Sequence, residues 1–130
     1  MRRVAIVGAG ALPFSSRYET TFRALALEAA KKAFEDCGLG PKDVDTVVWS
    51  IYCETMLRQQ IPNMILHDYL GMQGKGGLRV EAGAATDGYA LNAAFAQIAS
   101  GLCDVVLLSA VQKGGDFYSS LISYTASKKK

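Results

Sequence analysis

The stretch from Leu78 to Ala110, LRVEAGAATDGYALNAAFAQIASGLCDVVLLSA, constrains the fold more than any other part of this chain. Apolar runs predict strands over 78–83 and 104–110, and the helical spacing of apolar residues predicts a helix from about 87 to 100 between them. A strand, a helix and a second strand in this order form the unit from which parallel sheets are built. The stretch therefore predicts an α/β fold.

The first forty residues predict another strand and another helix. Val4–Val7 is a continuous apolar run, which is typical of a strand buried on both faces. Thr20 or Thr21 can cap a helix that runs to about Cys37 and ends at Gly38. Apolar residues at helical spacing predict the buried stripe of this helix, formed by Phe22, Ala26, Ala29, Ala30, Ala33 and Phe34.

The segment between these two parts completes the alternation. Val44–Tyr52 predicts a strand, and residues 56–70 predict a helix that Pro62 either kinks or starts. The glycine-rich run Gly71–Gly77 predicts a flexible connector. The predicted order is β-α-β-α-β-α-β, with a mainly parallel sheet flanked by helices.

Length and composition fit one domain with ample material for a core, since half of the 130 residues are apolar. The formal net charge is +2, and Arg2, Arg3 and Lys128–Lys130 at the two ends supply much of the basic side. The remainder is mildly acidic, so we expect no nucleic-acid partner. The apolar run near the N-terminus is too short for a signal peptide or a membrane span.

Three cysteines, Cys37, Cys53 and Cys103, lack the number and spacing of a disulfide framework or a zinc site. We therefore expect a cytoplasmic protein with no metal. Cys37 and Cys103 are interpreted as packing residues. Cys53 follows the end of a predicted strand, where parallel sheets hold their sites, but the neighbouring Glu54 is expected to raise the pKa of its thiol. Packing is thus favoured over catalysis here too.

Other candidate motifs are incomplete. Gly8 and Gly10 suggest a dinucleotide loop, but Pro13 occupies the place of the third glycine, so we interpret them as letting the chain turn off a strand. Gly74–Gly77, with Lys75 inside it, precedes a strand rather than a helix, unlike a phosphate loop. His67, the single histidine, has no cysteine or serine at meaningful spacing and is interpreted as a surface or packing residue.

The turn Ala82–Gly88 is the place where an α/β enzyme would hold a nucleophile or an anion. Unpaired N–H groups and the helix dipole converge at such a helix start. The turn contains neither cysteine nor serine. Thr86 and Asp87 are predicted to cap the helix and to favour its dipole. A charged carboxylate at position 87 would be a poor proton donor and would repel an anionic intermediate.

Four segments together resemble the N-terminal half of the thiolase superfamily, above all the acetyl-CoA acetyltransferases and the sterol-carrier-type or lipid-transfer thiolases. They lie in order between Arg3 and Phe117: VAIVGAGALPF, FRALALEAAKKAFEDCGL followed by PKDVDTVV, RVEAGAATDGYAL, and AFAQIASGLCDVVLLSAVQKGG. The resemblance implies a thiolase-like domain over residues 1–117. Residues 118–130 are then expected to form an irregular or disordered tail.

In that family, the turn before the third helix typically reads V-E-A-A-C-A-T-G-G and carries the nucleophilic cysteine. By this resemblance Ala84 falls on the cysteine, or Ala85 does if the alignment shifts by one, and Asp87 replaces a glycine. Acyl transfer through a thioester needs a thiolate, which a methyl group cannot replace. The resemblance thus implies that this chain alone lacks turnover by that route.

Family members are much longer, and their second half brings a G-H-P histidine and a second cysteine for proton transfer. The resemblance therefore implies carbon–carbon bond formation or cleavage on coenzyme A thioesters in lipid metabolism, with no resident cofactor. It also implies a homo-oligomer, commonly a dimer, or a partner subunit that supplies the other half. Members dimerise partly by pairing their third strands, to which Leu78–Ala82 corresponds.

Several functions stay open at this point. The chain can belong to a retro-aldol branch that uses residues of the other half, it can be a supporting subunit, or its cysteine can have been replaced by design. A non-catalytic module that binds acyl-CoA or lipid is the alternative to an enzyme. A nucleotide-binding oxidoreductase is disfavoured by the incomplete glycine fingerprint.

Overall fold

Strand β1 (Thr46–Ser50) is the centre of a three-stranded sheet within residues 1–15 and 19–115, which the computed structural model describes. β2 (Gly76–Val80) pairs with one edge of β1, and β3 (Val106–Ala110) pairs with the other. Both pairings are parallel, so the carboxyl ends of the strands meet at one edge of the sheet. The α/β class and the parallel sheet predicted from the sequence are confirmed.

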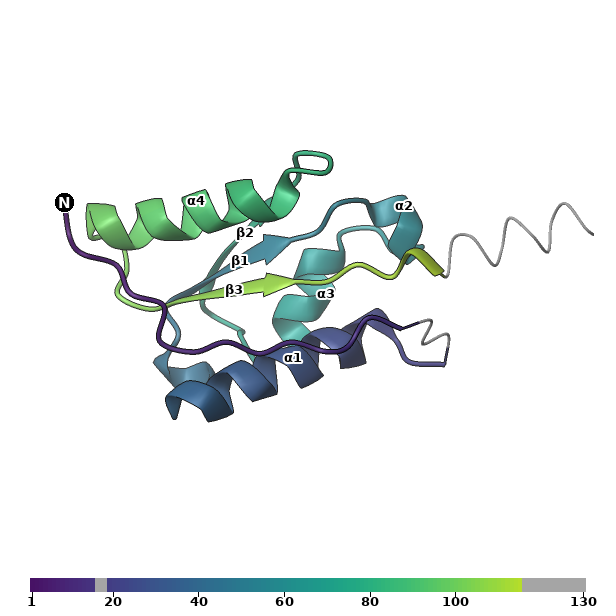
Figure 1. Cartoon of the computed structure of the whole chain (residues 1–130), viewed down its shortest axis with the longest axis horizontal. Helices are drawn as coiled ribbons and strands as arrows, with labels where there is room; N and C mark the ends of the chain where they lie inside the picture. Colours follow the sequence, from purple (N-terminus) through teal and green to yellow (C-terminus); the bar gives the residue numbers. More distant parts are fainter. Residues whose placement is uncertain (16–18, 116–130) are drawn as a thin grey trace, which may run out of the picture.

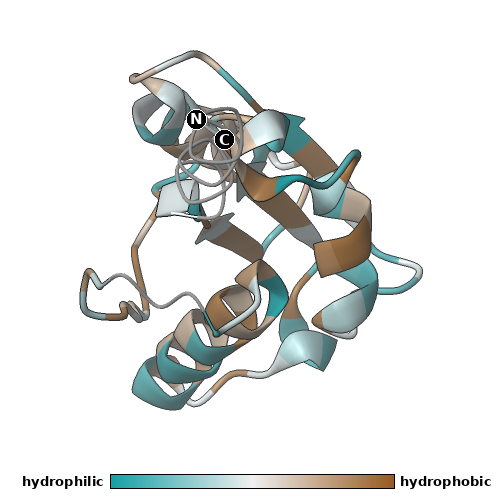
Figure 2. Ribbon diagram, turned by 90° about the vertical axis from the view of Figure 1, so that its right-hand side faces the viewer, coloured by the Kyte–Doolittle hydropathy of each residue, from teal (hydrophilic) through white to brown (hydrophobic). Residues whose placement is uncertain are grey.

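Helices cover both faces of this sheet (Figure 1). α4 (Thr86–Ser100) packs on one face, and α1 (Phe22–Cys37) and α3 (Pro62–Tyr69) pack on the other. The side chains of β1 alternate between the two layers. Val48 packs with Ala90 and Ala94 of α4, whereas the opposite face of β1 joins the larger core, whose strand members are Val47, Trp49 and Leu107. Figure 2 shows the apolar residues gathered on the strands between these helices.

The ends of α1 follow the predicted signals. The Thr21 side chain accepts a hydrogen bond from the Ala24 N–H at 3.2 Å, and Gly38, with φ of 71°, ends the helix in the left-handed conformation that glycine favours. Of the predicted buried stripe, Phe22, Ala26 and Ala30 are buried and the other three are half-buried. A single turn of 3₁₀-helix, η1 (Pro41–Asp43), then leads to β1.

Pro62 starts a helix rather than kinking one. The predicted helix over 56–70 is two helices, α2 (Glu54–Leu57) and α3, with Pro62 at the first position of α3. Proline suits this position because its missing N–H would have no helical partner there. Two residues between the helices, Arg58 and Ile61, have positive φ, which explains why one helix could not continue through them.

The strand predicted at Val4–Val7 is wrong. β2 and β3 occupy both edges of β1, so an apolar run here could pair only with the outer edge of β2 or of β3. Instead residues 1–15 form an irregular segment beside α1 (Figure 1), and the side chains of Ile6 and Val7 are exposed. The predicted order of four strands is therefore reduced to three in the part of the chain that the structure describes.

Gly8 and Gly10 let this segment lie against α1, which corrects their interpretation as a turn off a strand. A Cβ atom at Gly8 would lie 2.6 Å from the Ala33 carbonyl oxygen, and one at Gly10 would lie 2.3 Å from the Ala29 carbonyl oxygen. Real side chains do not approach backbone so closely. The contact is reinforced by a hydrogen bond of 2.9 Å from the Ala9 N–H to the Asp36 carboxylate.

The glycine-rich run before β2 is more ordered than the sequence predicts. Gly76 and Gly77 are strand residues that pair with Thr46 and Val47 of β1, so a flexible connector over Gly71–Gly77 is wrong at its C-terminal end. The expected tail over 118–130 lies outside the described residues. Among those described, no helix is both long and apolar enough to cross a membrane.

Candidate functional site

A hollow of about 850 Å³ opens at the carboxyl ends of the strands. Its wall is lined by Ser50 at the end of β1, Ala84 in the connection that follows β2, Asp87 in the first turn of α4, and Lys113 beyond β3. Residues 10–15 of the N-terminal segment close another side. The structure therefore brings Ala84, the residue predicted to replace a nucleophile, to a cavity at the sheet edge where α/β proteins bind ligands.

The turn that presents Ala84 is tightly bonded. Gly83 has φ of 57°, and the N–H groups of Ala85 and Thr86 donate to the carbonyl oxygens of Ala82 and Gly83 at 3.1 and 3.2 Å. The buried Thr86 hydroxyl accepts from the Ala82 N–H at 2.9 Å and donates to the Gly83 carbonyl oxygen at 2.6 Å. These bonds hold Ala84 exposed at the tip of the turn, next to the N-terminus of α4.

Thr86 and Asp87 do not cap α4 as predicted. The N-cap residue is Ala85, and no side chain caps the helix. The Thr86 hydroxyl is used within the turn instead. Asp87 does lie in the first turn, where a negative charge is favoured by the helix dipole.

Asp87 has a partner that the sequence analysis missed. Its carboxylate accepts a hydrogen bond from the hydroxyl of Ser50, which is only 3% exposed at the end of β1. The one sign of this pair in the sequence is that Ser50 is a single polar residue within the apolar run VVWSIY. The pair puts a carboxylate and a hydroxyl on the wall that also carries Ala84.

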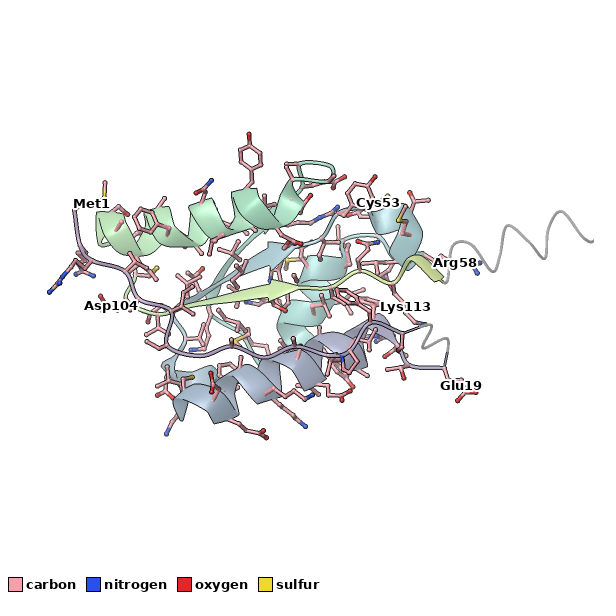
Figure 3. All side chains as sticks on the ribbon, in the orientation of Figure 1. Met1, Glu19, Cys53, Arg58, Asp104 and Lys113 are labelled. Atoms are coloured by element: carbon pink, nitrogen blue, oxygen red, sulfur yellow. The ribbon has the colours of Figure 1, made fainter. Side chains whose placement is uncertain are left out.

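Lys113 and Gln112 continue the site beyond β3. The Lys113 side chain is buried and lines the same hollow as Asp87. Gln112 joins the ends of two strands, because its amide accepts from the Cys53 N–H and donates to the Cys53 carbonyl oxygen, both at 3.3 Å. Figure 3 shows Cys53 and Lys113 at the same end of the sheet.

The pKa of the Cys53 thiol is lowered, which corrects the expectation that Glu54 would raise it. A hydrogen bond from the Met56 backbone is the largest cause. Glu54 is instead paired with Arg79, which also binds Glu81. Cys53 does not line the hollow around Ala84, so its catalytic role stays an untested alternative.

His67 and Lys75, the next two candidates, make contacts within the fold. His67 is half-buried, its ring packs edge-on against Trp49 with centroids 6.2 Å apart, and its Nε2 lies 3.2 Å from the Lys75 carbonyl oxygen. The Lys75 ammonium donates to the carbonyl oxygen of Lys42 at 3.2 Å and to that of Val44, so it holds two loops together rather than facing a phosphate.

The other two cysteines are also half-buried. Burial raises the pKa of the Cys103 thiol, and the Cys37 thiol donates to the Ala33 carbonyl oxygen at 3.1 Å. Among the residues with a described structure, no group of three His, Cys, Asp or Glu could hold a metal ion.

Comparison with known proteins identifies the domain. The model of the thiolase N-terminal domain matches residues 4–118. The chain belongs to the thiolase family. An acetyl-CoA acetyltransferase of Methanocaldococcus jannaschii is 36% identical over 117 residues, which cover 89% of this chain and 30% of that protein. The enzyme of the same name from Methanothermobacter thermautotrophicus is 31% identical over equal shares.

Ketoacyl synthases are related as well. A β-ketoacyl-[acyl-carrier-protein] synthase III of Helicobacter pylori is 33% identical over 89 residues, covering 68% of this chain and 27% of that protein. The crystal structure of the 3-oxoacyl-[acyl-carrier-protein] synthase III of Aquifex aeolicus shares the fold, with a TM-score of 0.68 and 21% identity over 83% of this chain and 44% of the other. This thiolase-family chain thus spans about 30% of the length of its acetyltransferase relatives.

Proposed function

We propose that this chain is a subunit or fragment of a thiolase-type assembly that acts on coenzyme A thioesters in carbon–carbon bond formation or cleavage, and that it supplies the shape of the acyl site without a nucleophile. One observation carries the proposal. Ala84 stands at the tip of a bonded turn, at the start of α4, on the wall of the hollow at the strand ends. The relatives named acetyl-CoA acetyltransferase support the thioester substrate.

The proposed site has the surroundings of a nucleophile but lacks the thiol that would react. In acyl transfer, a thiolate attacks the thioester carbonyl carbon, the acyl group moves to sulfur, and coenzyme A leaves as a thiol. Amides at a helix N-terminus favour both the thiolate and the negatively charged oxygen of the intermediate. The methyl group of Ala84 cannot take part. The Asp87 carboxylate, at the same helix start, opposes a second negative charge.

An exposed apolar surface supports a partner that supplies the rest of the site. Leu91 and Phe95 lie on the side of α4 that faces away from the sheet and are 50% and 44% exposed, and Leu102 follows them beyond the helix end. No strand of the described residues pairs with the outer edge of β2, where Leu78 is partly exposed. We propose that a second subunit, or a second copy of this chain, covers these residues.

Restoring the missing thiol tests the acyl-transfer proposal. The Ala84→Cys variant, co-expressed with candidate partner chains, is incubated with acetyl-CoA, and acetylated peptides are mapped by mass spectrometry. Ala96→Cys, at an exposed alanine within α4, is the matched control. We expect acetylation at position 84 well above that at position 96. Equal labelling, or none at position 84 with any partner, would contradict the proposal.

The Ser50–Asp87 pair favours a second candidate, retro-aldol cleavage, because this reaction needs a base and no thiolate. Asp87 would take the proton of a 3-hydroxyl group. The bond between carbons 2 and 3 of the acyl chain then breaks, a carbonyl compound leaves, and the electron pair forms a thioester enolate that is protonated. We expect the Asp87→Asn variant of the assembly to release no carbonyl compound from a 3-hydroxyacyl thioester. Unchanged release would exclude this role.

A non-catalytic role as an acyl-CoA-binding or lipid-binding subunit predicts a different pattern. Calorimetry would then show binding of coenzyme A thioesters to the wild-type chain, while the assembly's turnover would not change in the Asp87→Asn variant. Replacing Leu12, which lines the hollow, with aspartate should weaken such binding.

A further inference from the structure

A second cavity lies on the other face of the sheet, between α3 and the start of β2. Its volume is about 420 Å³, within the range of small-molecule sites. It shares no lining residue with the hollow around Ala84. Its walls combine flat or apolar side chains with polar ones: Trp49, Asn63, Met64, His67, Asp68, Gln73, Gly74, Lys75 and Gly77.

Trp49, which lines this cavity, carries a hydrogen-bond donor that has no partner among the described residues. Trp49 is 1% exposed, and its Nε1 atom is buried without a partner among the described residues. An unmade bond from a buried donor is costly, so native proteins seldom leave one. The Nε1 atom lies 3.8 Å from the point where a Cβ of Gly77 would stand, which places it beside the lining residue Gly77.

The imidazole of His67 provides a matching acceptor. Its Nε2 lies 3.2 Å from the Lys75 carbonyl oxygen, which can only accept, so Nε2 carries the proton. In the neutral ring, Nδ1 is then left with a lone pair. Nδ1 lies 3.1 Å from the same Cβ point of Gly77. A donor and an acceptor thus lie on two sides of one glycine.

The charged groups around the cavity are already engaged. Lys75 donates to the carbonyl oxygens of Lys42 and Val44, and Gln73 donates to the Asp68 carboxylate at 2.7 Å. The Lys75 ammonium and one oxygen of the Asp68 carboxylate therefore already have hydrogen-bond partners within the protein. The cavity's unused groups, an N–H and a nitrogen lone pair beside flat rings, complement a carbonyl oxygen and an N–H on one planar group.

We propose that this cavity binds a small, uncharged, planar molecule bearing a primary carboxamide, such as an aromatic amide. The carboxamide oxygen accepts from the Trp49 Nε1–H, its N–H donates to His67 Nδ1, and its ring lies in the cavity beside Met64. The bond to Trp49 requires a small movement of the wall beside the indole, because Nε1 has no exposed surface in the empty cavity.

The single tryptophan of the chain makes the test direct, because its indole N–H gives one NMR resonance. The full 130-residue chain is titrated with nicotinamide. We expect a saturable downfield shift of that resonance with a dissociation constant on the order of 1 mM, typical of a ligand of this size. Nicotinate, which is anionic, and N,N-diethylnicotinamide, which has no N–H, should bind at least tenfold more weakly.

Variants separate the two contacts. Trp49→Phe removes the donor and His67→Phe removes the acceptor, and each should weaken nicotinamide binding at least tenfold in ligand-observed NMR. Tyr69→Phe, at an exposed site on α3, the helix that carries His67, is the matched control and should bind like the wild type. The proposal is overturned by an indole resonance that does not shift, by equal binding of nicotinate, or by undiminished binding in His67→Phe.

Discussion

The Ser50 hydroxyl donates a hydrogen bond to the Asp87 carboxylate and so joins the end of the central strand to the first turn of α4. The two residues are 37 positions apart in the sequence. Because Ser50 is buried, its hydroxyl has few alternatives to this partner. The pair therefore fixes how the helix start is placed over the sheet edge, where the hollow opens.

Removing this bond should destabilise the fold. For Ser50→Ala we expect the free energy of unfolding to fall by about 1–3 kcal/mol, because a bond to a charged group is lost. Urea denaturation measures the change. Ser100→Ala, at an exposed serine in the last turn of α4, serves as the control and should change it by less than about 0.5 kcal/mol. Equal effects of the two substitutions would contradict the role given to Ser50.

Replacing each of two glycines with alanine should change the stability of the fold in opposite directions. Gly10→Ala puts a Cβ 2.3 Å from the Ala29 carbonyl oxygen, so we expect a loss of about 1–3 kcal/mol or release of the N-terminal segment. Gly88 lies within α4 with nothing within 4 Å of its Cβ position, so Gly88→Ala should stabilise by about 0.5–1 kcal/mol. Thermal unfolding monitored by circular dichroism gives both signs.

Protonation of Asp45 should contribute to the loss of folding stability at low pH. Backbone hydrogen bonds from Val105 and Asp104 lower the pKa of its carboxyl below the ordinary value. A group with a lowered folded-state pKa stabilises the fold above its unfolded pKa, near 3.9, and this stability is lost as the pH falls through the folded pKa. Asp45→Asn should therefore flatten the fall of the melting temperature below about pH 4. Glu35→Gln, at an exposed residue of α1, should leave that fall unchanged.

The cysteines should differ in reactivity. Backbone hydrogen bonding lowers the pKa of the Cys53 thiol, whereas burial raises that of Cys103. The thiolate is the reactive form, so Cys53 should be alkylated by iodoacetamide faster than Cys103 at neutral pH. Peptide mapping over time measures both rates. Faster alkylation of Cys103 would show that these surroundings do not set the thiol pKa values.

Local signals predicted most of the fold. The extent of α1 follows from Thr21 and Gly38 at its ends, that of α4 follows from helical spacing, and β1 lies within the predicted strand Val44–Tyr52. The strand at Val4–Val7 was predicted from an equally apolar run and is absent. Apolar character indicates that a segment can be buried in a sheet, but the free edge that pairs with it is a property of the whole fold.

The candidate site was predictable only where it is local. The turn around Ala84 could be found because strand, turn and helix are consecutive. The bond from Ser50 to Asp87 and the engagement of Cys53 by Gln112 join residues 37 and 59 positions apart, which one sequence does not pair. The lowered thiol pKa of Cys53 was missed for another reason, since its main cause is a backbone hydrogen bond and not the neighbouring carboxylate.

The thiol pKa of an Ala84→Cys variant tests the central claim most directly, because that claim gives position 84 the electrostatics of a nucleophile site. The pH dependence of its alkylation rate is measured in the chain with Cys37, Cys53 and Cys103 replaced by serine and Asp87 replaced by asparagine, because the Asp87 carboxylate would oppose a thiolate on the same wall. We predict a pKa clearly below the ordinary value of about 8.5, and below that of Ala96→Cys, at an exposed alanine within α4, in the same background. A pKa at or above 8.5 at position 84 would contradict it.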